Sequence, residues 1–167
     1  MTRNITLALV VALLSCSPYA HASAQPRPDF SGTWTLDTDK SDPVRGPGGG
    51  PTGGGQVGPV TLRITQTATE LTIERSAGDR TMKAVYKLDG SETVNQGPRG
   101  GEQRSRSRWE GSALVTESVQ QMSTPRGDVT IEIKETRTLQ DDGTLLLVTV
   151  TRSPRGENTR KAVFKRS

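Results

Sequence analysis

The chain has 167 residues, of which 31% are hydrophobic, 4% aromatic and 24% charged, and its formal net charge at pH 7 is +4. This length predicts one domain, and the low apolar content favours elements that bury only one face. With one cysteine and one histidine, the chain is excluded from forming an internal disulfide or a zinc site of the usual His/Cys kind. The modest charge and few aromatic residues argue against a nucleic-acid partner.

The first 24 residues predict a cleavable export signal. Arg3 supplies a positive start, residues 5–14 form an apolar core, and residues 20–24 offer small side chains for cleavage. A membrane-spanning helix needs roughly 20 apolar residues, so this run is too short and no later segment comes close. We expect cleavage after Ala24 and a periplasmic or secreted product without a membrane span.

Cys16 leaves an alternative open. The segment LLSC at residues 13–16 resembles the bacterial lipobox, in which the cysteine is acylated and becomes the mature N-terminus. The protein would then be an outer-membrane lipoprotein, and residues 16–27 would form a tether. In the other interpretation, this cysteine is discarded with the signal.

Cleavage after Ala24 removes 24 of the 167 residues and leaves 143, with 21 basic and 18 acidic side chains and a net charge of +3. Cys16 and His21 leave with the signal, so Ser-His and Cys-His pairs and histidine proton shuttles are excluded. No serine lies in a nucleophile elbow, and no carboxylate pair stands out from the charged surface. We therefore expect no enzyme activity, no metal and no cofactor.

The mature chain consists mainly of short runs in which apolar and polar residues alternate. Period two is typical of half-buried antiparallel strands, and no window shows a helical stripe. Pairs such as Asp89-Gly90 and Asp142-Gly143 separate the runs and are typical of tight hairpins. We predict eight strands and a ninth candidate, at residues 31–37, 60–66, 70–76, 80–88, 103–110, 113–121, 128–139, 144–152 and, as the ninth, 159–166.

Residues 43–59 break this pattern with eight glycines and four prolines. Such a segment cannot bury enough apolar surface to offset the entropy of ordering it. It separates the first predicted strand from the rest. We therefore expect a long first loop within a single domain that spans residues 25–167.

The tripeptide Gly32-Thr33-Trp34 resembles the G-x-W of the first strand in lipocalins and related calycin barrels. Because a run of predicted antiparallel strands follows it, the resemblance implies an all-β, up-and-down, eight- or nine-stranded lipocalin-like barrel. The run 159–166 looks like the closing strand of fatty-acid-binding barrels. The whole layout is similar to exported bacterial lipocalin-like domains of uncharacterised function.

The resemblance also implies a barrel floor. In lipocalins the tryptophan plugs the closed end and an arginine of a late strand packs over it, an arrangement that is favourable when desolvated. Arg160 and Arg166 are the available partners, and we assign Arg160 to this floor with Gly32 and Trp34. The first loop of lipocalins is a lid over the open mouth, whereas here it is mostly glycine.

The predicted interior suggests a binding site. Its lining would be the alternate residues of two strands, which are Met82, Ala84, Tyr86, Leu88, Val129, Ile131 and Ile133. Glu135 and Arg137 follow on the second of these faces, and an inward arginine could bind a ligand carboxylate, as in fatty-acid-binding barrels. We expect a small apolar or amphipathic ligand, with Tyr86, Glu135 and Arg137 as polar anchors. The alternative places Glu135 and Arg137 at the rim, in solvent.

Two further interpretations concern the outer surface. Arg104, Arg106 and Arg108 alternate with smaller or apolar residues and so share one strand face. This face could attract anionic partners, but we favour a solvated face whose charges discourage edge pairing. The alternative to a ligand-binding barrel is a filled barrel that acts through its outside as an envelope interaction or inhibitor module.

Overall fold

The structure is a computed structural model that describes residues 27–43, 59–97, 101–124 and 127–167. The predicted export signal, Cys16 and most of the 43–59 segment lie outside these residues. Within them, the chain forms strands and no helix. The strands are β1 (Gly32–Leu36), β2 (Thr61–Gln66), β3 (Glu70–Ala77), β4 (Arg80–Lys87), β5 (Glu92–Gln96), β6 (Glu102–Glu110), β7 (Ala113–Thr124), β8 (Gly127–Leu139), β9 (Leu145–Ser153) and β10 (Gly156–Arg166).

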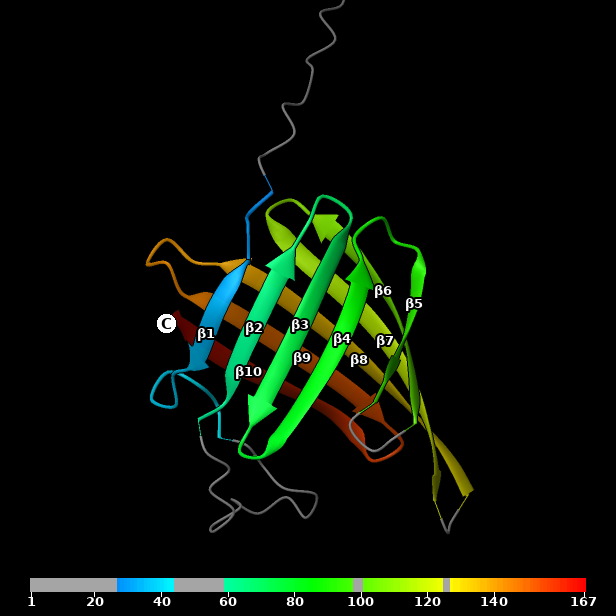
Figure 1. Cartoon of the computed structure of the whole chain (residues 1–167). Coiled ribbons are helices and arrows are strands. Elements are labelled where there is room, and N and C mark those ends of the chain that lie inside the picture. The colour runs from blue at the N-terminus through cyan, green and yellow to red at the C-terminus, as the bar shows by residue number, and fades with distance from the viewer. Residues whose placement is uncertain (1–26, 44–58, 98–100, 125–126) are drawn as a thin grey trace, which may run out of the picture.

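These ten strands form one antiparallel sheet in the order β4-β3-β2-β1-β10-β9-β8-β7-β6-β5. Successive strands are neighbours, except that β4 and β5 lie at the two edges and that β1 also pairs with β10. Figure 1 shows β1 to β4 as a front layer, with β6 to β10 crossing behind them. The sheet is therefore a nearly closed up-and-down barrel, as the resemblance to calycin barrels implies, although with more strands.

A side chain joins the two sheet edges where the backbone ladder is missing. The Val85 N–H donates to Asn95 Oδ1 at 2.8 Å, and Asn95 Nδ2 donates to the Val85 carbonyl at 2.8 Å. A carboxamide offers both a donor and an acceptor, so one side chain of β5 satisfies two backbone groups of β4. The barrel is thus held together between β4 and β5 by Asn95.

The strand count corrects the prediction of eight or nine strands. The nine predicted segments are all strands, and the additional one is β5, whose inner residues are polar. Thr93 lies opposite Ser105, which is buried, whereas Val94 points outward and is 54% exposed. An apolar residue on the outside and polar residues on the inside reverse the usual alternation, so the pattern concealed this strand.

The hairpins follow from the turn residues. Gly78 links β3 to β4 with φ +59°, and Gly111 links β6 to β7 with φ +60°. Each is the first of two turn residues, where a type II′ turn requires a positive φ that glycine adopts without strain. These turns set the register of the strands that carry the inner side chains.

The two ends of the barrel differ in packing. We call the end with the β2–β3, β6–β7 and β8–β9 turns the closed end, and the opposite one the open end. Fully buried apolar side chains fill the closed end, namely Phe30, Trp34, Leu71, Leu114 and Leu145. Toward the open end, the inward-facing side chains are only half-buried, namely Met82, Ala84, Ile131, Ile133 and Thr149.

Candidate ligand-binding site

The predicted polar anchors come together inside the barrel. Arg137 on β8 is buried, and its Nη2 donates to Glu135 Oε2 at 2.6 Å, on the same strand face. Its Nη1 donates to Thr116 Oγ1 at 3.2 Å, and the guanidinium carbon lies 5.6 Å from the ring centroid of Tyr86 on β4. The rim interpretation is therefore wrong for Arg137, whereas its role as a ligand anchor stays a prediction.

Burial and neighbouring charge set the ionisation of this cluster. Burial, followed by the negative charge of Glu135, raises the pKa of the Tyr86 phenol to about 12. Burial opposes the charge on Arg137, yet its interactions with Glu135 and Tyr86 together outweigh burial and hold the pKa of Arg137 above its usual value. At neutral pH the cluster thus contains a neutral phenol and a paired guanidinium and carboxylate, so an incoming carboxylate would have to displace Glu135.

A polar seam, which the sequence analysis did not predict, runs from this cluster along the inner faces of β6 and β7. Ser107 and Thr116 hydroxyls lie 2.8 Å apart, and Ser105 and Ser118 hydroxyls lie 2.9 Å apart; all four are buried. Thr116 also accepts from Arg137, so the seam is continuous with the cluster. The alternation of serine with arginine on β6 was the available signal, and it correctly assigned Ser105 and Ser107 to the face opposite the arginines.

The floor is built around Trp34, and its cation is Arg166 rather than the predicted Arg160. The Trp34 Nε1 donates to the Phe30 carbonyl at 2.9 Å, and the Arg166 guanidinium lies 4.6 Å from the centroid of the ring. Gly32 makes this stacking possible, because a Cβ there would lie 3.2 Å from Arg166 Nη1 and its φ is +137°. The G-x-W spacing thus leaves room for the guanidinium above the indole.

Arg160 instead faces the barrel interior toward the open end. Arg160 is four residues before Phe164 on β10 and therefore lies on the same inner face of the strand. It pairs with Thr149 of β9, whose side chain is half-buried on that face. Its Nε atom is buried and has no hydrogen-bond partner among the described residues. Burial, followed by the like charge of Arg75, lowers the pKa of Arg160. This inward pair of cations, Arg75 and Arg160, was not predicted.

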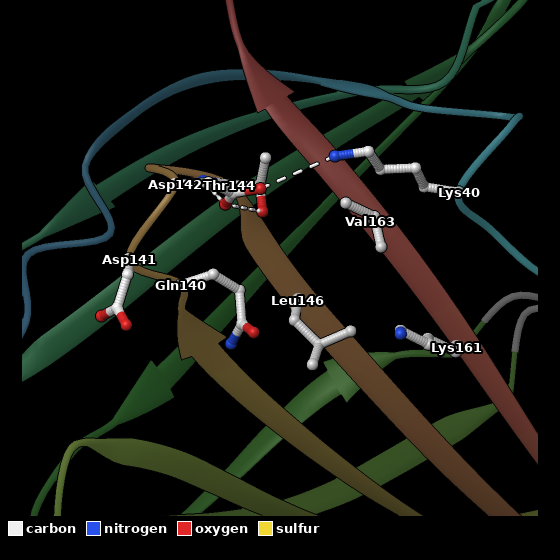
Figure 2. A pocket seen from close by; sticks show the side chains of 8 residues that line it. All are labelled: Lys40, Gln140, Asp141, Asp142, Thr144, Leu146, Lys161 and Val163. Atoms are coloured by element: carbon white, nitrogen blue, oxygen red, sulfur yellow. Dashed lines mark hydrogen bonds and ion pairs between the residues drawn. The ribbon is translucent and has the colours of Figure 1, made fainter.

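A groove lies on the outside of the barrel, between the segment after β1 and the β8–β9 turn. Its volume is about 520 Å³, and Leu146 and Val163 provide its apolar part. Figure 2 shows Lys40 reaching Asp142 across the groove, where the two form an exposed ion pair at 3.6 Å. Leu146 and Val163 are paired across β9 and β10, and they face outward because the adjacent residues Leu145 and Phe164 face the core. The sheet therefore separates the groove from the barrel interior.

The arginines on the outer face of β6 are already paired. Arg104 and Arg106 both contact Glu92 of β5, at 3.3 Å and 3.5 Å, and Arg108 contacts Glu117 of β7 at 3.0 Å. Exposed pairs of this kind contribute little to stability. They leave no concentrated positive charge on this face, which agrees with the solvated-face interpretation.

Among the described residues, no group of three or more His, Cys, Asp or Glu side chains is arranged to hold a metal ion. This part of the chain also has no helix that is long and apolar enough to cross a membrane.

Comparison with solved structures defines the class of fold. The zebrafish ileal bile acid-binding protein complexed with cholic acid superposes with a TM-score of 0.60 at 13% identity, covering 83% of this chain and 98% of that one. The REP1-NXSQ fatty acid transporter gives 0.57 at 15% identity, with 82% and 95% coverage, and Caenorhabditis elegans lipid binding protein 8 gives 0.58 at 17%, with 83% and 95%. The neighbours are fatty-acid-binding-protein-like barrels of the calycin superfamily, and these identities show the fold alone.

No family model matches the sequence, and no curated protein matches it significantly. The likeness to calycin barrels that Gly32-Thr33-Trp34 suggested is thus supported by the fold alone, through the solved structures above. Only the predicted number of strands is wrong, because the described residues form ten strands instead of eight or nine.

Proposed function

We propose that the barrel binds a small apolar or amphipathic molecule in the open half of its interior. The observation that carries this proposal is the partial exposure of inward-facing apolar side chains such as Met82, Ala84 and Ile133. These side chains lie on the inner face of the sheet, and β4, which carries Met82 and Ala84, is one of its two edge strands. An apolar ligand that covers them would gain about 25 cal/mol for each Å² removed from water.

The fold neighbours support the same class of ligand. They are named as a bile acid-binding protein, a fatty acid transporter and a lipid binding protein, that is, as binding and transport proteins. We therefore propose a binding protein and not an enzyme. The filled-barrel alternative requires an inner face that is buried throughout, and the half-buried residues of the open end argue against it.

We also propose that this binding takes place outside the cytoplasm. The support is the N-terminal sequence, with its apolar core at residues 5–14 and small residues at 20–24. Acylation of Cys16 would place the same barrel on a membrane surface through a lipid anchor. Intact-mass measurement of the protein from its native envelope separates the two, since only the lipoprotein carries diacylglycerol on Cys16.

A neutral fluorescent probe tests the interior site. The fluorescence of N-phenyl-1-naphthylamine increases in apolar surroundings. We therefore expect its fluorescence to rise when it binds inside the wild-type barrel. Ala84→Trp places an indole inside the barrel and should abolish the signal. Lys83→Trp is the matched control, because Lys83 is exposed on the outer face of the same strand. Equal binding by both variants would contradict an interior site.

A further inference from the structure

The half-buried apolar side chains of β8 lead to a carboxylate inside the barrel. On the inner face of this strand, Ile131 and Ile133 are half-buried, and Glu135 is the next inward residue toward the closed end. The neighbours of Glu135 across the sheet are Thr116 on β7 and Thr149 on β9. Because inward side chains recur at every second residue of a strand, a tail that lies along the two isoleucines brings its head group against Glu135.

Arg137 is already neutralised by this carboxylate. It lies one inward position deeper than Glu135 and is buried. Its Nη2 donates to Glu135 Oε2 at 2.6 Å and its Nη1 to Thr116 Oγ1 at 3.2 Å, while the ring of Tyr86 lies against the guanidinium. Separating a buried guanidinium from its carboxylate is costly because a desolvated charge is left unpaired. A ligand that arrives from the open end therefore meets Glu135 before Arg137, and Glu135 takes the place of an acid group on the ligand.

Glu135 keeps one oxygen unpaired. Its Oε2 is bonded to Arg137, but its Oε1 has no hydrogen-bond partner among the described residues, although the side chain is only 21% exposed. The hydroxyl of the neighbouring Thr149 also makes no hydrogen bond within this part of the chain. A carboxylate only accepts, whereas a hydroxyl both donates and accepts. A ligand hydroxyl can therefore donate to Glu135 and accept from Thr149, whereas a ligand carboxylate would meet a like charge.

We propose that Glu135 acts as a built-in counter-ion, through which the interior site selects an amphiphile with an uncharged hydroxyl head group over one with an acidic head group. This inference rests on the proposed interior ligand and specifies its head group. Arg160 acts in the opposite sense, since it pairs with Thr149 from β10. It lies two strands away from the isoleucines of β8, however, so the head group of a ligand along β8 contacts Glu135 instead.

The test compares three ligands that share an oleyl chain and differ in the head group. Oleyl alcohol, methyl oleate and oleate would be titrated by calorimetry into the wild type, Glu135→Gln and Glu132→Gln. Glu132 is exposed on the outer face of β8, so its substitution removes the same charge outside the barrel. In the wild type, oleyl alcohol should bind about tenfold tighter than oleate, which meets a like charge, and also tighter than methyl oleate, which cannot donate.

The substitution at Glu135 should reverse this preference. In Glu135→Gln the guanidinium of Arg137 loses its partner and becomes available to a ligand carboxylate, so oleate should bind about tenfold tighter than it binds the wild type. Glu132→Gln should bind all three ligands as the wild type does. Glu135→Asp keeps the carboxylate and should retain the wild-type order of affinities.

The outcomes separate this selectivity from the proposed function. If none of the three ligands binds the wild type, the proposed function fails and the selectivity with it. If they bind, but oleate equals or exceeds oleyl alcohol, the interior site stands and the role of Glu135 is refuted. Equal binding of methyl oleate and oleyl alcohol by the wild type, or an unchanged oleate affinity in Glu135→Gln, would also overturn the proposal.

Thermal melts keep the test decisive if Glu135→Gln is only marginally stable. A ligand that binds the folded state alone raises the midpoint of unfolding. Oleate should therefore raise the midpoint of Glu135→Gln more than oleyl alcohol does, whereas the wild type should show the reverse order. The same order in both proteins would contradict the selection by Glu135.

Discussion

The closed and open ends of this barrel are built from the same strands but have opposite inner surfaces. At the closed end, Phe30 and Trp34 are completely buried, and Trp109 stacks on Phe30 with ring centroids 5.8 Å apart. At the open end, Met82 and Ile133 remain half-buried, and Arg160 keeps an unpartnered donor. Among the described residues, the large aromatic side chains lie toward the closed end, whereas the open end, where we propose that the ligand binds, is lined by smaller apolar side chains.

The largest expected effect comes from breaking the closed end at Trp34. Trp34→Ala removes a completely buried indole and the ring on which Arg166 stacks, and it should lower the free energy of unfolding by about 3–5 kcal/mol. Val94→Ala is the control, since Val94 is 54% exposed, and it should change stability by less than about 0.5 kcal/mol. Urea unfolding measures both. A loss below about 1 kcal/mol for Trp34→Ala would refute its role as the floor.

The second effect lies between the two ends, at the Arg137 pair. Glu135→Gln leaves a buried guanidinium without its counter-charge and should destabilise the protein by about 3 kcal/mol. Removing both charges, in Glu135→Gln with Arg137→Met, should restore at least half of that loss, because no unpaired charge then remains. A double variant that is less stable than Glu135→Gln would show that Arg137 stabilises the barrel without Glu135.

The third prediction uses Tyr86 to report burial through pH. The phenol has a pKa of about 12 in the folded protein against 10.0 in the unfolded chain, so the folded state retains a proton that the unfolded state releases. Its contribution to stability is complete below pH 10 and is lost as the pH rises to 12, by about 2–3 kcal/mol. Urea unfolding across this range, compared with Tyr86→Phe, isolates the effect. Parallel curves for the two proteins would mean that the phenol is not buried.

The smallest expected effect concerns the seam between β4 and β5. Asn95→Ala removes two hydrogen bonds to Val85 and should cost about 1–2 kcal/mol, with faster amide exchange at Val85. Gln96→Ala, at an exposed neighbouring position, is the control. Unchanged exchange at Val85 in Asn95→Ala would indicate that the barrel does not depend on this amide for closure.

The sequence predicted the architecture because most strands bury apolar residues on one face. Nine of the ten strands follow from this alternation, and the face shared by Tyr86 and Arg137 was assigned from it. The tenth strand was missed because Val94 points outward and its neighbours Thr93 and Asn95 point inward. On β6, by contrast, the inner residues Ser105 and Ser107 are also polar, but their regular alternation with three arginines was enough to predict the strand.

The pairing of charged side chains was predicted less well. Arg160 and Arg166 both lie on the inward face of β10, and only the register with β1 shows that Arg166 meets Trp34. Burial, followed by the like charge of Arg75 on β3, lowers the pKa of Arg160 on β10, although these two strands are far apart in the sequence. Interactions between strands so far apart in the sequence depend on how the sheet closes, which period-two patterns do not specify.

The most direct measurement is a nuclear magnetic resonance titration of methyl-labelled protein with oleate. Binding in the open half of the interior should shift the methyl signals of Ala84, Ile131 and Ile133, which face inward. The methyl groups of Leu146 and Val163, which line the outer groove, should not move. Shifts confined to Leu146 and Val163, or no shifts at all, would contradict a ligand site inside the barrel.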